Sequence, residues 1–131
     1  MSVRVCLDEE KSRIVVECIG QVVRREAGWA AERVSELLRS QPVSGILIDA
    51  NQVEEQNSPT LSSEMISSFL LAMESTAPIA YVRPARWTQA YYNRVLNAIQ
   101  DSRAPHLAMF DEIDAATDWL RNAAAGNAIT G

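Results

Sequence analysis

Two hydrophobic periodicities follow each other along the first third of the chain. Apolar and polar residues alternate over Val3–Leu7 and Ile14–Ile19, as they do in β-strands, and the polar segment Asp8–Arg13 lies between them. We therefore predict a β-hairpin. From Ala27 the apolar residues recur at helical spacing, which predicts a helix whose apolar stripe consists of Ala27, Ala30, Val34, Leu37 and Leu38.

The charged residues of the hairpin predict its register. If Leu7 lies opposite Ile14, residues of opposite charge face each other across the two strands. These pairs are Arg4 with Glu17 and Asp8 with Arg13. The same register puts Cys6 on the polar face and Cys18 on the apolar face, too far apart for a disulfide. Both thiols are expected to be free.

The rest of the chain alternates strands and helices. Gly45–Ala50 is an almost unbroken apolar run, which is typical of a strand covered on both faces. Ser58 and Pro59 predict a helix start, since serine caps a helix and proline suits its first position, and this helix is expected to run to about Ser75. The remaining elements are expected to be a strand over Pro78–Val82, a helix over Arg86–Ile99, a strand over His106–Phe110 and a helix capped by Asp111.

This order, ββαβαβαβα, predicts an α/β domain with a mixed five-stranded sheet and four helices. Successive parallel strands require crossover helices that pack on the sheet, so only the hairpin pair is expected to be antiparallel. We expect one domain over residues 1–124 and a flexible tail over residues 125–131.

Composition argues against two classes of protein, those that bind nucleic acid and those that insert into a membrane. The chain has 131 residues, a formal net charge of −5 and a single lysine, Lys11. An acidic chain poor in lysine is ill suited to nucleic acid, whose phosphates are neutralised by Lys and Arg. The amino terminus lacks a secretory signal, and no run approaches the roughly 20 apolar residues of a membrane span. We expect a cytoplasmic protein that binds no nucleic acid and does not insert into a membrane.

Side chains that usually catalyse reactions or bind metals are sparse. The one histidine, His106, is expected at the start of the last strand, away from the edge where open α/β sheets place their sites. One histidine and two separated cysteines form no metal-ligand cluster, and no glycine-rich phosphate loop is present. We therefore expect no metal, no cofactor and no catalytic residue.

Three polar residues are expected at the carboxyl ends of the inner strands. Asp49 closes the third strand, Ser58 begins the second helix, and Arg83 closes the fourth strand. The N–H groups of a helix start, together with Arg83 and Arg86, are suited to an oxyanion, while Asp49 can orient a partner's hydroxyl or amide. The alternative interpretation is a helix cap with solvated loop charges, and spacing alone leaves both open.

Arginines and aromatic residues interleave over Arg83–Arg94. This composition is typical of a surface that anchors a partner, with Trp87 as the candidate anchor. The same residues can instead form core packing, with the arginines on the solvated face of a helix. Both interpretations stay open.

The element order and three segments resemble the STAS domain, and more closely the SpoIIAA-like proteins. The segments are Gly45–Val53, Asn57–Leu61 and Phe110–Leu120. Anti-sigma-factor antagonists of this type carry an Asp at the end of the third strand, a Val four residues later, and an Asp-Ser-Ser-Gly-Leu motif whose first serine is phosphorylated by a partner kinase. The matching positions here are Asp49, Val53, Ser58 and Leu61. The departures are Asn57 for the acidic residue, Pro59 after the serine and Thr60 for the glycine.

The resemblance implies a non-enzymatic regulatory module that works by binding a protein partner or a small ligand, either anionic or lipid-like. The expected binding residues are Asp49, Asn57, Ser58, Arg83, Arg86 and Trp87. A lipid-like ligand would lie between the sheet and the helices, against residues that core packing also explains: Met65, Phe69 and Met73. The alternative is a small enzyme that uses Asp49 as a base beside Arg83. A homodimer is left open.

Overall fold

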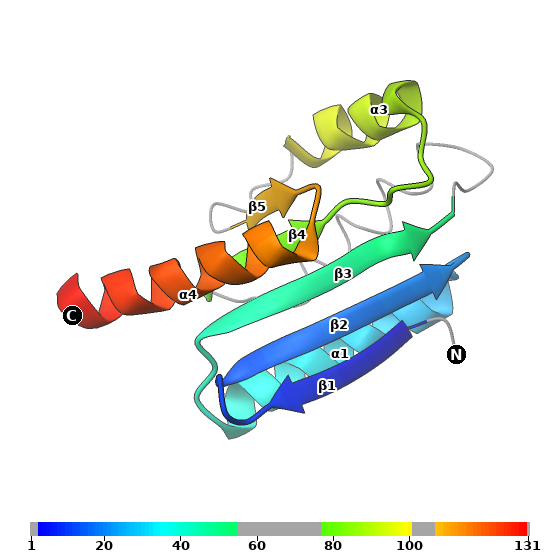
Figure 1. The fold of residues 1–131 in the computed structure, drawn as a ribbon. Coiled ribbons are helices and arrows are strands. Elements are labelled where there is room, and N and C mark those ends of the chain that lie inside the picture. The colour runs from blue at the N-terminus through cyan, green and yellow to red at the C-terminus, as the bar shows by residue number, and fades with distance from the viewer. Residues whose placement is uncertain (1–2, 55–76, 101–106, 131) are drawn as a thin grey trace.

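A single five-stranded sheet organises the molecule (Figure 1). The computed structural model describes residues 3–54, 77–100 and 107–130. The strands lie in the order β1-β2-β3-β4-β5, and only the β1–β2 pair is antiparallel. Their bounds are β1 (Val3–Asp8), β2 (Arg13–Gly20), β3 (Gly45–Val53), β4 (Ile79–Val82) and β5 (Leu107–Phe110). The predicted mixed sheet is confirmed.

The hairpin has the predicted register. Leu7 pairs with Ile14, and this pairing aligns the oppositely charged residues across β1 and β2. The aligned pairs are Arg4 with Glu17 and Asp8 with Arg13. Cys6 is exposed, Cys18 packs against the core, and both are free, as the register required.

The described residues contain three helices: α1 (Arg24–Ser40), α3 (Gln89–Gln100) and α4 (Ile113–Thr130). The helix expected from Ser58 to about Ser75 lies outside the described residues. α3 begins later than the predicted start at Arg86. The reason is local, because the Thr88 hydroxyl accepts a hydrogen bond from the Tyr91 N–H at 3.2 Å and so caps the helix.

α4 differs from the prediction at both ends. The helix begins at Ile113, and the Glu112 carbonyl accepts the Ala116 N–H at 3.3 Å, so Glu112 rather than Asp111 occupies the cap position. At the other end, the helix continues past Gly126 to Thr130. Alanines around Gly126 favour a helix, and one glycine costs only about 1 kcal/mol. The expected domain boundary at residue 124 falls inside α4, and a flexible tail stays a prediction.

Different helices cover the two faces of the sheet. α1 packs on β1 and β2, whereas α4 crosses the opposite face over β3, β4 and β5 (Figure 1). When successive parallel strands are added in one direction across a sheet, right-handed connections place their helices on one face. α4 follows the last strand and connects no pair of strands, so it can pack on the other face. The half of that face over β1 and β2 carries no described helix (Figure 1).

Two apolar cores result, one on each face. The larger core lies against α1 and includes a row of paired residues that crosses all five strands: Leu7, Ile14, Ile46, Ile79 and Leu107. The smaller core lies beneath α4 and consists of Leu47, Ala80, Val82, Ala116 and Leu120. Together the two cores hold the carboxyl ends of β3, β4 and β5 next to the start of α4.

The two thiols should differ sharply in reactivity. Burial raises the pKa of the Cys18 thiol to about 12, and the charges of Asp49 and Glu17 add to this increase. A thiol that stays protonated and buried is a poor nucleophile. We expect Ellman's reagent at neutral pH to modify Cys6 in the folded protein and Cys18 only after unfolding. Cys6→Ser should therefore leave no fast thiol, and two fast thiols in the wild-type protein would contradict the assignment.

Candidate functional site

The carboxyl end of β3 is shaped by a bulge. Glu17 pairs with Asp49, but Ile19 pairs with Gln52, so β3 holds one residue more than β2 over this stretch. The Asp49 carboxylate accepts the Asn51 N–H at 3.1 Å and thereby satisfies a backbone group that the irregular pairing releases. The bulge thus fixes Asp49 and Asn51 at the end of the strand.

Asp49 and Arg83 come to the same edge, as the topology predicted. Asp49 pairs with Val82, the last residue of β4, and Arg83 follows directly. The Arg83 N–H donates to the Phe110 carbonyl at 2.8 Å, which joins the ends of β4 and β5. Residues that follow β5 therefore belong to the same edge.

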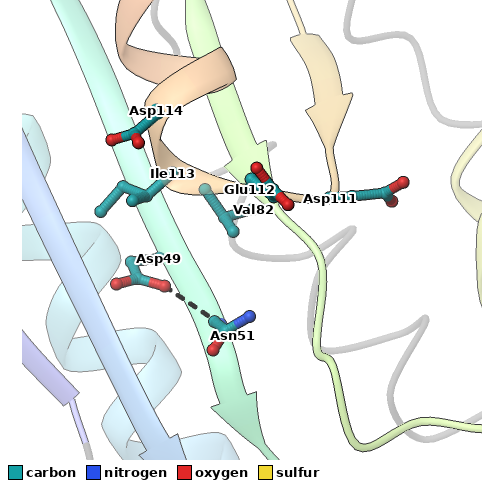
Figure 2. A pocket seen from close by; sticks show the side chains of 7 residues that line it. All are labelled: Asp49, Asn51, Val82, Asp111, Glu112, Ile113 and Asp114. Carbon is teal, nitrogen blue, oxygen red and sulfur yellow. Dashed lines mark hydrogen bonds between the residues drawn. The ribbon is translucent and has the colours of Figure 1, made fainter.

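A pocket with a volume of about 320 Å³ opens at this edge (Figure 2). Figure 2 shows Ile113 and Asp114 projecting from the first turn of α4 toward the strand that carries Asp49. Ile113 is 44% exposed, although its spacing along α4 places it on the same face as the buried Ala116 and Leu120. The lining residues are Asp49, Asn51, Val82, Asp111, Glu112, Ile113 and Asp114. The lining includes four carboxylates, of which Asp111 pairs with Arg83, so Asp49, Glu112 and Asp114 make the pocket acidic.

Arg83 makes contacts within its own chain. Its Nε atom lies 3.4 Å from an Asp111 carboxylate oxygen, and its guanidinium stacks over the Tyr92 ring at 4.4 Å from the ring centre. Burial raises the pKa of the Tyr92 hydroxyl, while the Arg83 charge acts in the opposite direction. These contacts bind Arg83 between α3 and the start of α4.

Arg86 and Trp87 have separate environments. Arg86 is exposed and pairs with Glu54 at 3.2 Å, which links the end of β3 to the segment before α3. Trp87 is only 6% exposed and packs edge-to-face on Tyr91, with ring centres 4.7 Å apart. Among the described residues its indole N–H has no hydrogen-bond partner. The structure therefore places Trp87 in the core, which is the packing interpretation of this segment.

The expected anion site is described only in part. Asn57 and Ser58 lie outside the described residues, so their place beside Arg83 stays a prediction. Sequence reasoning missed the run from Asp111 to Asp114, which it treated as a helix start alone. The signal was available, because Asp111 follows a strand that the predicted sheet places beside β4.

Within residues 3–54, 77–100 and 107–130, no group of three or more His, Cys, Asp or Glu side chains is arranged to hold a metal ion. In the same part of the chain, no helix is long and apolar enough to cross a membrane.

Two solved structures align with almost the whole chain and identify its fold. No protein-family model and no curated protein matches the chain. The solved structure of the anti-sigma factor antagonist SpoIIAA in its unphosphorylated form aligns with a TM-score of 0.60 and 12% identity, covering 92% of this chain and 96% of that chain. An anti-sigma factor antagonist from Mycobacterium paratuberculosis aligns with a TM-score of 0.59 and 15% identity, covering 92% and 95% of the two chains. The chain therefore has the STAS fold of SpoIIAA that its sequence predicted.

Proposed function

We propose that this chain is a non-catalytic regulatory module of the cytoplasm that acts by binding another protein at the carboxyl edge of its sheet. Two solved structures that share the fold are of anti-sigma factor antagonists, and this likeness supports a regulatory role. The observation that carries the proposal is the pocket at that edge, which is lined by an exposed Ile113 and by the carboxylates of Asp49, Glu112 and Asp114. An apolar centre within a charged rim is the usual anatomy of a protein interface.

The charge of the pocket selects the partner's chemistry. Asp49, Glu112 and Asp114 favour a cationic group, and they disfavour the acidic or phosphorylated ligand that the sequence suggested for this edge. Arg83, the residue expected to receive such an anion, instead pairs with Asp111. We therefore propose a partner that presents an arginine or lysine next to an apolar side chain.

The enzyme alternative gains no support from the geometry. It required Asp49 to act as a base beside Arg83, whereas the Asp49 carboxylate accepts a backbone N–H and Arg83 is held by Asp111 and Tyr92. A lipid-like ligand against Met65, Phe69 and Met73 concerns residues outside the described part of the chain. Neither is therefore part of the proposal.

Charge reversal at the pocket tests the proposal. The double variant Glu112→Lys/Asp114→Lys should reduce the amount of partner that coprecipitates from extracts of the source cells by at least about tenfold, because it replaces attraction with repulsion. Each lysine opposes the dipole at the start of α4 and costs about 0.3–1 kcal/mol, so a thermal melt must show that the variant is folded.

Glu9→Lys/Glu10→Lys is the matched control, because it also reverses two acidic side chains. Glu9 and Glu10 are exposed in the loop that joins β1 to β2, at the opposite edge of the sheet, so this change alters the net charge by the same amount without altering the pocket. The control should retain the partner at the wild-type amount. Equal recovery with the folded double variant would overturn the assignment of the pocket.

A further inference from the structure

Ile19 is a large apolar side chain left in water at the end of β2. It is 49% exposed, although isoleucine is among the residues that proteins most often bury. Alternation along β2 puts Val16 in the larger core and Val15 against the smaller core, so Ile19 shares the face of Val15. Ile19 therefore lies on the α4 face of the sheet, in the half that carries no described helix (Figure 1).

The acidic pocket is one strand away from Ile19. Alternation along β3 puts Asp49 on the α4 face as well, because Leu47 belongs to the smaller core and Ile48 to the larger one. Asp49 lines the pocket and pairs with Glu17, two residues before Ile19. With the usual spacing of strands and rise per residue, the Cα atoms of Asp49 and Ile19 lie about 8 Å apart. One segment of a bound protein can therefore reach both.

Asp49 lies between Ile19 and the exposed isoleucine of the pocket. In Figure 2, Asn51 follows Asp49 toward the carboxyl end of β3, and Ile113 lies on the other side of Asp49. Ile19 pairs with Gln52, beyond Asn51. In the described part of the chain the exposed large apolar side chains are Ile19, Val23, Trp29 and Ile113. Two of these four thus border a single carboxylate on one face of the sheet.

Like charges lie side by side next to Ile19. Glu17 and Asp49 are cross-strand neighbours on one face, an arrangement that costs stability. The row of paired residues that they belong to contains one cation and two anions: Arg4, Glu17, Asp49, Val82 and Phe110. An uncompensated negative charge of this kind in a sheet commonly marks a place with a function beyond folding. A cation supplied by a bound protein would offset it.

We propose that the partner of this chain binds a surface that extends from the acidic pocket across β3 to Ile19. The inference rests on the proposed function and adds a second apolar contact to it. One segment of the partner places an arginine or lysine over Asp49 and an apolar side chain on each side, against Ile113 and Ile19. A segment with only the basic residue, or with one apolar residue, loses part of the contact, so the spacing of the two isoleucines selects the partner.

Photocrosslinking from position 19 tests this surface. A photoreactive phenylalanine derivative at position 19 should crosslink, in the source cells, to the same protein as the same group at position 113. The two contact residues should lie in one segment of that protein, on opposite sides of a lysine or arginine. Position 23 is the control, because Val23 is also exposed but lies at the start of α1, which packs on the other face. It should not give this adduct.

A synthetic peptide with the sequence of the crosslinked segment gives the quantitative test. Ile19→Ala should weaken binding of this peptide, measured by fluorescence anisotropy, by at least about fivefold, because it removes one of the two apolar contacts. Val23→Ala should change the affinity by less than about twofold. Ile19 is half-exposed, so its truncation leaves the fold intact, and a urea titration of each variant verifies this.

The outcomes separate this inference from the proposed function. Unchanged affinity in folded Ile19→Ala, or an adduct from position 113 without one from position 19, would overturn the extended surface and leave the proposed function standing. An adduct that joins position 19 to a second copy of this chain would also overturn it. The absence of any adduct from position 113 would instead contradict the proposed function, and the extended surface with it.

Discussion

Replacing Ile46 by alanine should lower the free energy of unfolding by about 3 kcal/mol. Ile46 is completely buried on β3 and pairs with Ile14 on one side and Ile79 on the other, in the middle of the row that crosses the sheet. Truncation removes apolar contacts in the larger core and leaves a cavity that strands fixed on both sides cannot fill. Urea denaturation followed by circular dichroism measures the change.

Ile19→Ala is the matched control for this prediction. Ile19 is also a strand isoleucine, but its side chain is 49% exposed. Its truncation should cost less than about 1 kcal/mol, because only part of the apolar area leaves water in the native state. Equal losses at the two positions would contradict the assignment of Ile46 to the central row.

Gly45→Val should also destabilise the protein, by about 1–3 kcal/mol. A Cβ atom at Gly45 would lie 3.0 Å from the Leu120 Cδ2 atom and 3.5 Å from the Pro78 carbonyl oxygen. The branched side chain must therefore push α4 away from the start of β3 or force Leu120 out of its position. The same urea titration reports the loss, and the near-ultraviolet signal of Trp119, which packs beside Leu120 in the smaller core, reports the displacement of α4.

The control in this case changes a glycine with no close neighbour. Gly28 lies inside α1, is exposed, and has no atom within 4 Å of the place where its Cβ would be. Gly28→Ala should stabilise the protein by about 0.5–1 kcal/mol, because alanine favours the helix and restricts the unfolded chain. A loss of stability in Gly28→Ala, or none in Gly45→Val, would contradict the packing of α1 and α4 described here.

The sheet was predictable because its signals are local and reinforce one another. In the hairpin, alternation sets which residues face the core, and two pairs of opposite charges then select the register. In β3, an apolar run without alternation indicated a strand buried on both faces, and its residues indeed contribute to both cores. Chain order and crossover handedness supplied the rest of the topology.

The pocket was harder to predict, because it depends on contacts between residues that are distant in sequence. Asp49 and Arg83 were assigned to one edge from topology, but the partner of Arg83 is Asp111, which lies 28 positions further along the chain. Spacing does not reveal that Arg83 turns toward that carboxylate and the Tyr92 ring. The exposure of Ile113 is a related case. Helical periodicity places Ile113 on the same face as Ala116 and Leu120, which are buried, but Ile113 is the first residue of α4 and remains exposed at the edge of the sheet.

Trp87 illustrates a second limit of prediction from sequence, which is whether an aromatic side chain is exposed or buried. Arginines and aromatic residues interleaved over Arg83–Arg94 fitted both an exposed anchor and a packed segment, and only the tertiary packing distinguishes them. Because Thr88 caps α3, Trp87 precedes the helix and packs on Tyr91 within the core. Tyr91 and Tyr92 are buried as well, so none of the three aromatic residues of this segment is available to a partner.

The central claim is that another protein binds this chain at the acidic pocket, and site-specific photocrosslinking in the source cells tests it most directly. A photoreactive phenylalanine derivative at position 113 should give an adduct with a protein other than this chain, and the same group at the control position 10 should not. Mass spectrometry of the adduct should identify a contact peptide with a lysine or arginine beside an apolar residue. Adducts of equal yield from both positions, or none from position 113, would contradict the claim.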